Sequence, residues 1–407
     1  MTEKPKQSAA AVAAIGFLAL ASAMGIGRFS LTPILPLMQR DAGLTLAQGG
    51  WLASGNYLGY LAGALVCIVL APPPAPAIRW GLAGVGLFTL AMGLTDSEPL
   101  WLASRFLAGA ASAFVLVGVS AWAMPLLVRH GREEWSGRVF AGVGAGIAFA
   151  GLFGLAAGIE AWRSRATWIA LGVVAVALAV LLWHRLGDHR LGDDRLGDEA
   201  PHTVSAAQPR HRALPRPAIV AAACYIAFGY GYIIPATFLP ALARGYIDDP
   251  AIFGLIWPVF GTAGAVSTFA AARLGRGLAP WQLWTRAQWV LAVGVLLPTL
   301  TINVVTLLLS ALCVGGTFMI ITMAGIKEAL RLGGAPASLA VGVMTAAFAI
   351  GQIAGPLTVS LLAGSSNAFA LASLVAAFGL VAGNCVLLAC SARWEKLAQI
   401  GSRPNEA

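Results

Sequence analysis

The feature that most constrains this chain is a series of long apolar runs that recur along the whole sequence. Each run holds about 20 or more residues, which is the length a helix needs to cross the ~30 Å hydrocarbon layer of a bilayer. Of the 407 residues, 58% are hydrophobic and only 11% are charged, against about 25% charged residues in soluble domains. A transmembrane β-barrel would need alternating segments of about 10 residues, and the sequence has none. The sequence therefore predicts an all-α polytopic membrane protein.

We count twelve runs, six on each side of a polar segment in the middle of the chain. Pro298 and Asn303 are the main signals that divide residues 281–326 into two runs. The twelve runs cover residues 9–38, 45–70, 78–95, 99–128, 136–159, 166–184, 217–243, 251–272, 281–299, 301–326, 337–362 and 366–391.

The start of the chain also resembles a signal peptide. Lys4 and Lys6 precede an alanine-rich apolar run, which is the usual order in such a peptide. The run continues through Arg28 to Pro36, however, well past the length of a signal peptide's apolar region. We therefore expect an uncleaved first transmembrane helix.

Lysine and arginine residues between the runs predict the orientation. With both chain ends in the cytoplasm, nineteen of them face the cytoplasm, four face the opposite side and three lie within runs. This asymmetry is typical of inner-membrane proteins, whose cytoplasmic loops are rich in basic residues. We expect a multi-pass protein of the bacterial inner membrane with both termini in the cytoplasm. The four basic residues on the opposite side are Arg40, Arg163, Arg165 and Arg244.

The net charge of +9 does not indicate a nucleic-acid partner, because the basic residues lie in the loops between apolar runs. The cysteines all fall inside apolar runs without the spacing of metal ligands, and we interpret them as small packing residues. A nucleotide-binding loop is also missing, so we expect no metal, no cofactor and no ATP-driven pumping. The cysteines are Cys67, Cys224, Cys313, Cys385 and Cys390.

The polar segment 185–216 is expected to be a flexible cytoplasmic linker, because it contains Pro201, Pro209 and Pro215 and is followed directly by Pro217. Residues 184–198 repeat a five-residue pattern ending in Arg-Leu-Gly-Asp, which fits repeat slippage in a tolerant linker better than ligand binding. The predicted domains are an N-terminal six-helix bundle, 1–184, and a C-terminal six-helix bundle with a short cytoplasmic tail, 217–407.

The two halves of the chain share a sequence pattern. Gly-x-Gly followed after seven residues by Leu-Pro occurs at 25–36 and again at 229–240, an offset of 204. A Gly-Val pair with a later glycine occurs at 142–151 and at 342–351, an offset of 200. Two matches in equivalent runs indicate a duplicated six-helix unit. Many secondary transporters have this layout, with a binding site at the membrane midplane between the repeats.

Arg28 lies inside the first copy of this pattern, with no acidic residue near it before Asp41. An arginine near the bilayer centre costs about 2.5–3.5 kcal/mol on insertion scales, so its side chain must face protein, water or a ligand. The glycines before it and the prolines after it should loosen the helix. Tyr232 occupies the equivalent position of the second copy.

Several segments give the chain a resemblance to the major facilitator superfamily over almost its whole length, and more narrowly to the YbfB/YjiJ family of bacterial transporters. The resemblance implies twelve transmembrane helices in two pseudo-symmetric six-helix bundles and transport of a small molecule. The segments are Gly25-Ile-Gly-Arg28-Phe29 with Thr32-Pro33 and Leu35-Pro36, Gly50-Trp51-Leu52-Ala53, Asn56-Tyr57-Leu58-Gly59-Tyr60, Arg105-Phe-Leu-Ala-Gly109, Phe238-Leu239-Pro240, and Gly351-Gln352 with Gly355-Pro356.

The chain departs from the superfamily pattern at two places. A proline-rich segment, 72–76, replaces the charged loop associated with gating between the second and third runs, although Arg273-Leu-Gly-Arg276 remains after the eighth. The antiporter motif of the fifth run lacks its proline at 142–146. We expect an inward gate of different construction, and the resemblance does not settle an antiport mechanism.

Polar residues near the middle of the runs are the candidates for the transport path. At about 1.5 Å per residue, Arg28 lies roughly 5 Å beyond the middle of its run. Arg105 lies about six residues into its run, and Arg286 is expected to snorkel to the interface. The candidates are Arg28, Asn56, Tyr57, Tyr60, Arg105, Tyr230, Tyr232 and Gln352.

Each candidate also has a purely structural interpretation. The tyrosines could anchor helices at the interface, and Asn56 could hydrogen-bond between helices. Gln352, flanked by glycines, could serve close packing. Arg28 could pair with helix-end carbonyls or with Asp41, and Arg105 could snorkel.

The acidic residues all fall in loops or at the ends of runs, and no histidine lies in the middle of one. Proton-coupled carriers commonly use a buried Asp, Glu or His. Glu160, at the outer end of the fifth run, is the nearest to membrane depth. Either a proton is carried at Glu160, or it travels on the substrate, or transport is coupled to another ion.

These observations favour a monomeric secondary transporter whose partners are the lipid bilayer and a small-molecule substrate. Two arginines without a central carboxylate favour an organic anion, because a guanidinium binds a carboxylate through two parallel hydrogen bonds. Proton-coupled efflux of amphipathic compounds is the alternative. An embedded enzyme would need a catalytic constellation within the runs, and a receptor would usually add a soluble domain; the sequence has neither. Uptake and efflux both remain open.

Overall fold

The structure is a computed structural model that describes residues 7–186, 215–246, 254–275, 277–332, 336–362 and 367–401. Within these residues the chain is helical and contains no strand. Most of the predicted linker, 187–214, lies outside them, as do some of the loop arginines counted above, such as Arg190 and Arg276.

The predicted runs correspond to helices along the chain. In the described residues, eleven helices are long and apolar enough to cross a membrane, and Ile256–Ala271 forms a shorter apolar helix where the eighth run was predicted. The predicted division at Pro298 and Asn303 is confirmed, because Asn303 caps the helix that starts at Val304. The all-α membrane fold inferred from the sequence is therefore confirmed.

In the first half the elements are α1 Ala9–Leu20, η1 Ala21–Ile26, α2 Leu31–Asp41, α3 Leu46–Leu70, α4 Pro74–Leu94, α5 Glu98–Arg129, η2 Glu133–Trp135, α6 Ser136–Ile159 and α7 Ser164–Trp183. In the second half they are α8 Arg216–Tyr246, α10 Ile256–Leu274, α11 Pro280–Leu300, α12 Val304–Arg331, α13 Ala337–Leu361 and α14 Ala368–Gly401.

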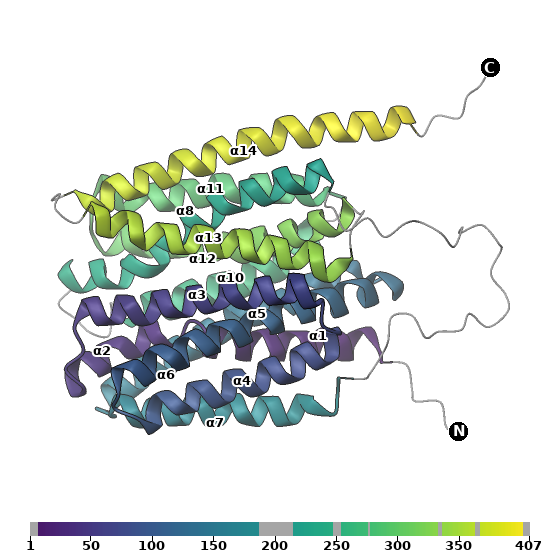
Figure 1. Ribbon diagram of the computed structural model, residues 1–407. Helices are drawn as coiled ribbons and strands as arrows, with labels where there is room; N and C mark the ends of the chain where they lie inside the picture. Colours follow the sequence, from purple (N-terminus) through teal and green to yellow (C-terminus); the bar gives the residue numbers. More distant parts are fainter. Residues whose placement is uncertain are drawn as a thin grey trace, which may run out of the picture.

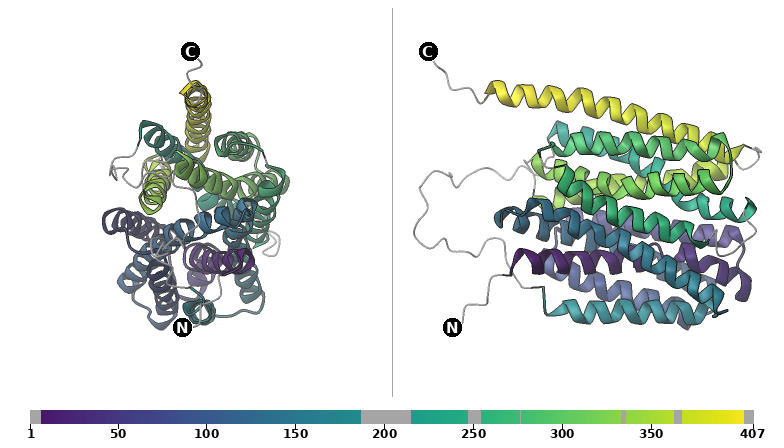
Figure 2. Two further views of the ribbon diagram at one scale, coloured as in Figure 1. Left: turned by 90° about the vertical axis from the view of Figure 1, so that its right-hand side faces the viewer. Right: turned by 180° about the vertical axis from the view of Figure 1, so that it is seen from behind.

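The long helices lie side by side, and the start of α1 and the end of α14 are at the same end of the molecule (Figure 1). Seen along the helices, the purple to blue helices of the first half and the green to yellow helices of the second half occupy opposite sides (Figure 2). Within the first half α5 packs against α3 and α4, and within the second α8 packs against α13 and α14.

The two halves meet along two helix pairs, α6 with α10 and α3 with α13. Glycines allow the first pair to approach closely, since a Cβ on Gly144 would lie 2.2 Å from the backbone nitrogen of Ala265. A Cβ on Gly261 would lie 2.3 Å from the backbone nitrogen of Ala148. Most of the candidate residues are buried in the core, namely Arg28, Asn56, Tyr57, Tyr60, Arg105, Tyr232 and Gln352.

Candidate transport site

The first membrane crossing is interrupted near its middle. Before the interruption, η1 is a π-helix in which the Gly27 nitrogen donates to the Ser22 carbonyl at 2.9 Å and the Phe29 nitrogen to the Met24 carbonyl at 3.2 Å. Residues 27–30 then form a turn before α2 begins. This confirms the expected weak point, and π-helical turns of this kind frequently occur at functional sites.

Arg105 of α5 bonds the backbone carbonyls that this interruption releases. Its Nη1 donates to the Gly27 carbonyl at 3.0 Å and its Nη2 to the Arg28 carbonyl at 2.6 Å. The Arg105 carbonyl in turn accepts from Nδ2 of Asn56 at 2.9 Å. Arg105 is only 1% exposed, so it does not snorkel; it holds the interrupted segment in place.

Two serines that sequence reasoning missed complete this backbone support. Ser112 of α5 donates from Oγ to the Ala23 carbonyl at 2.9 Å, and Ser30 donates to the Ile26 carbonyl at 2.5 Å. Ser112 lies seven residues after Arg105, on the same face of α5, so helical spacing could have indicated it.

Arg28 extends from the turn into the seam between the two halves. Its side chain is 3% exposed, and Nη2 donates to Oε1 of Gln352 on α13. Its guanidinium carbon lies 3.7 Å from the ring centroid of Tyr60, 5.6 Å from that of Tyr57 and 5.5 Å from that of Phe29. Four of the predicted residues therefore meet here, from both halves of the chain.

Several polar atoms of this group have no hydrogen-bond partner. They are Nε and Nη1 of Arg28, the hydroxyl of Tyr60 and Nε2 of Gln352. Asp41 does not pair with Arg28, because its carboxylate accepts from the backbone nitrogen and hydroxyl of Ser164 at 2.5 and 2.7 Å. Within the described part of the chain, no salt bridge involves Arg28.

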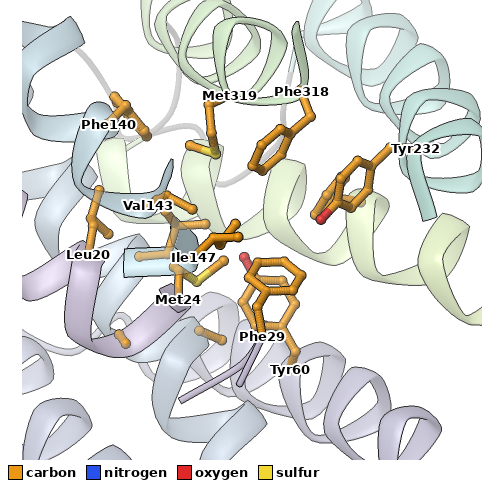
Figure 3. Close-up of a cluster of buried hydrophobic side chains, with 14 of the residues drawn as sticks. Leu20, Met24, Phe29, Tyr60, Phe140, Val143, Ile147, Tyr232, Phe318 and Met319 are labelled. Carbon is orange, nitrogen blue, oxygen red and sulfur yellow. The ribbon is translucent and has the colours of Figure 1, made fainter. Parts of the chain in front are cut away.

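Tyr232 approaches the same region from the second half, inside a cluster of aromatic rings (Figure 3). Its ring stacks on Phe318 with centroids 5.0 Å apart and on Phe348 at 5.7 Å, and its hydroxyl has no partner. Tyr225, Phe228 and Tyr232 follow the spacing of one helical face, so the sequence does carry a signal for this cluster.

A small space separates the Arg28 group from this aromatic cluster. Its lining includes Phe29, Tyr60, Tyr225, Phe318 and Phe348. It is just large enough for about one water molecule. Both halves contribute to the lining, and the described surface is almost wholly apolar apart from the tyrosine hydroxyls and two threonines.

The fold and this site can be compared with known proteins. The model of a family described as "Uncharacterised MFS-type transporter YbfB" matches residues 20–388. The chain belongs to this family of MFS-type transporters.

A relative described as the MFS-type transporter YceJ of Bacillus subtilis is 30% identical to this MFS-type chain over 151 residues. The aligned region covers 35% of the present chain and 36% of the relative. The chain therefore spans about a third of the length of the curated relative it matches.

Two predicted residues of this MFS-type transporter, Tyr230 and Glu160, are not among the residues found in contact with the Arg28 guanidinium. Tyr230 is half-buried with an unpaired hydroxyl, and its backbone nitrogen would lie 2.6 Å from a Cβ on Gly351. Glu160 is exposed at the C-terminal end of α6. The buried acid in the described residues is instead Glu328 near the end of α12, which accepts from Arg331 at 2.9 and 2.6 Å.

Proposed function

We propose that this MFS-type secondary transporter moves a small organic anion, a carboxylate on an apolar body, by alternating access. The observation that carries the proposal is Arg28, a buried guanidinium with two unpaired nitrogens and no salt-bridge partner among the described residues. A buried cation is costly unless it is paired, and a carboxylate would supply the missing charge.

The shape of the guanidinium supports a carboxylate in particular. Nη2 of Arg28 is occupied by Gln352, which leaves Nε and Nη1 for the ligand. A planar carboxylate accepts parallel hydrogen bonds from the Nε/Nη2 edge or the Nη1/Nη2 edge of a guanidinium. A carboxylate bound in this way would therefore take Nη2 of Arg28 from Gln352. The hydroxyl of Tyr60 and Nε2 of Gln352 are further unpaired groups that could donate to the same anion.

The aromatic rings beside the central space support an apolar body on this anion. Phe318, Phe348 and Tyr225 line the space opposite Tyr60 and Phe29. Because the space holds about one water, a substrate enters only when the halves move apart. The hydrogen bond from Arg28 to Gln352 joins the two halves, so a carboxylate that competes for Arg28 would also loosen this connection.

The same aromatic cluster favours a second candidate, efflux of amphipathic compounds. A ligand held mainly by Phe318, Phe348 and Tyr232 would be bound through apolar surface and ring stacking, without a need for negative charge. The two candidates differ in whether removal of the Arg28 charge abolishes transport.

Counterflow in proteoliposomes tests the proposal. A panel of monocarboxylates, amines and neutral compounds of equal size is offered to the wild type and to Arg28→Ala, with and without a pH gradient. We expect the wild type to exchange carboxylates and the Arg28→Ala variant to lose this exchange. Exchange of amines or neutral compounds that survives in Arg28→Ala would overturn the anion proposal and favour the second candidate.

We also propose that both termini lie in the cytoplasm of a bacterial cell. The excess of basic residues in the corresponding loops supports this orientation. Labelling of single cysteines introduced at Arg163 and at Arg129 from outside the cell tests it, since only the first should react.

A further inference from the structure

A second group of arginines lies at the end of the bundle where α6 begins and α10 ends. The residues line a polar pocket to which both halves of the chain contribute. They are Arg132, Glu134, Trp135 and Arg138 from the first half, and Phe269 and Arg273 from the second.

The arginines of this pocket carry more charge than the local acids balance. Glu133 is bound by Lys327 at 2.8 Å, and Glu134 lies 3.8 Å from Arg132. Arg138 and Arg273 form no salt bridge with any residue that the structure describes. The charges of Arg138 and Arg273 are therefore available to bind an anion.

Aromatic rings fix the position of these two arginines. The guanidinium carbon of Arg138 lies 3.9 Å from the Trp135 ring centroid and 5.9 Å from that of Phe269. That of Arg273 lies 5.3 Å from the Phe269 centroid. Arg138 of the first half and Arg273 of the second half thus both contact the Phe269 ring. Beside them, no side chain caps the first backbone N–H groups of α6. The helix N-terminus adds partial positive charge.

An exposed apolar strip leads to the pocket along α10. Val266 is 63% exposed and Phe269 is 39% exposed, and with Arg273 they lie at a spacing of three and four residues, on one helical face. A ligand that has both an anionic group and an apolar chain matches this surface, whereas a free anion would leave the strip unused.

We propose that this pocket binds the headgroup of an anionic phospholipid, with the phosphate between Arg138 and Arg273 and an acyl chain along Val266 and Phe269. Basic pockets between transmembrane helices bind such headgroups. Because the pocket is built by both halves, the bound lipid stabilises the arrangement in which α6 and α10 meet at this end, by the reciprocity of linked equilibria.

Thermal unfolding of the purified full chain in detergent, titrated with phosphatidylglycerol, tests this site. Phosphatidylcholine and inorganic phosphate are the parallel titrations. We expect only phosphatidylglycerol to raise the unfolding temperature of the wild type. The Arg138→Gln/Arg273→Gln double variant should need about twenty-fivefold more lipid for the same shift, about fivefold per arginine.

Arg286→Gln is the matched control, because Arg286 is an exposed arginine near the start of α11 at the same end of the bundle. It should respond like the wild type. The single Arg273→Gln variant, at an exposed side chain, covers the case in which the double variant does not fold. The site is refuted if Arg273→Gln keeps the full response, if Arg286→Gln loses as much, or if inorganic phosphate alone gives the same shift.

Discussion

The first crossing, α1 to α2, and its repeat, α8, begin from the same sequence pattern and differ in backbone structure. Residues 25–36 and 229–240 share Gly-x-Gly and Leu-Pro at one offset. The first crossing is interrupted by a π-helix and a turn, whereas α8 is continuous from Arg216 to Tyr246. The shared residues therefore do not explain the interruption.

What the two crossings do share is close packing at the first glycine of the pattern. A Cβ on Gly25 would lie 2.3 Å from the Gly146 backbone in α6. A Cβ on Gly229 would lie 2.4 Å from the Phe348 carbonyl oxygen in α13. Helices α6 and α13 carry the second repeated pattern, so the repeated glycines preserve a contact between equivalent helices.

What differs is the polarity of the surroundings. The offset of 204 pairs Arg105 with Leu309 and Asn56 with Phe260. In the first half, Arg105 donates to the released carbonyls of Gly27 and Arg28, and Asn56 donates to the Arg105 carbonyl. An open backbone needs such partners, because an unpaired carbonyl in an apolar interior is costly. The site therefore has a polar half around the first crossing and an aromatic half around α8.

The largest expected effect comes from removing the support of the interruption. Arg105→Met leaves the Gly27 and Arg28 carbonyls without their donors. At about 1–3 kcal/mol for each of these two buried unpaired groups, the free energy of unfolding should fall by about 2–6 kcal/mol. Substrate exchange should also be lost, because the backbone of Arg28 is no longer fixed. Thermal unfolding and counterflow measure the two effects.

Leu309→Met is the matched control on α12, at a side chain that is 44% exposed. We expect a change below about 0.5 kcal/mol, as is usual for exposed sites. Equal destabilisation by the two variants would show that Arg105 has no special role at the interruption.

The second largest expected effect is a loss of stability when the glycines that the two crossings share are replaced by alanine. Gly25→Ala and Gly229→Ala both force backbone apart and should each lower stability by about 1–3 kcal/mol. Gly231→Ala meets the flexible Leu380 side chain instead, at 2.6 Å, and should cost less. The order of the three unfolding temperatures is the measurement; a Gly231 variant that is the least stable would contradict this account of the repeat.

The smallest effect on stability is expected at the two tyrosine hydroxyls. Neither Tyr60 nor Tyr232 has a hydrogen-bond partner for its hydroxyl, so Tyr→Phe at either position should change stability by less than about 0.5 kcal/mol. Tyr60 lies over Arg28, and its loss should weaken carboxylate binding several-fold. Tyr232→Phe should weaken it less. Equal losses of carboxylate binding in Tyr60→Phe and Tyr232→Phe would contradict the distinction between the polar and the aromatic half of the site.

The sequence predicted the helices of the fold well, because the length and spacing of apolar runs are local properties. It also singled out Arg28, Tyr57, Tyr60 and Gln352, since a polar residue inside an apolar run is conspicuous. The contact of Arg28 with Gln352 could not be predicted, because the two residues are 324 positions apart and meet only after the halves pack.

The aromatic half of the site was largely missed for a related reason. Phe228, Phe318 and Phe348 are ordinary residues of an apolar run, and only their convergence around Tyr232 distinguishes them. The role of Arg105 depends on the π-helical turn in another segment. Helical spacing within α5 cannot reveal such a partner.

The central claim is that the unpaired nitrogens of Arg28 recognise a carboxylate. Equilibrium binding of a monocarboxylate and of an amine with the same apolar body, to the wild type, Arg28→Lys and Arg28→Ala, tests it most directly. We predict that the wild type prefers the carboxylate, that Arg28→Ala binds it about 100-fold more weakly, and that Arg28→Lys lies between, because lysine keeps the charge but not the fork. Unchanged carboxylate binding in Arg28→Ala, or a wild type that prefers the amine, would contradict the claim.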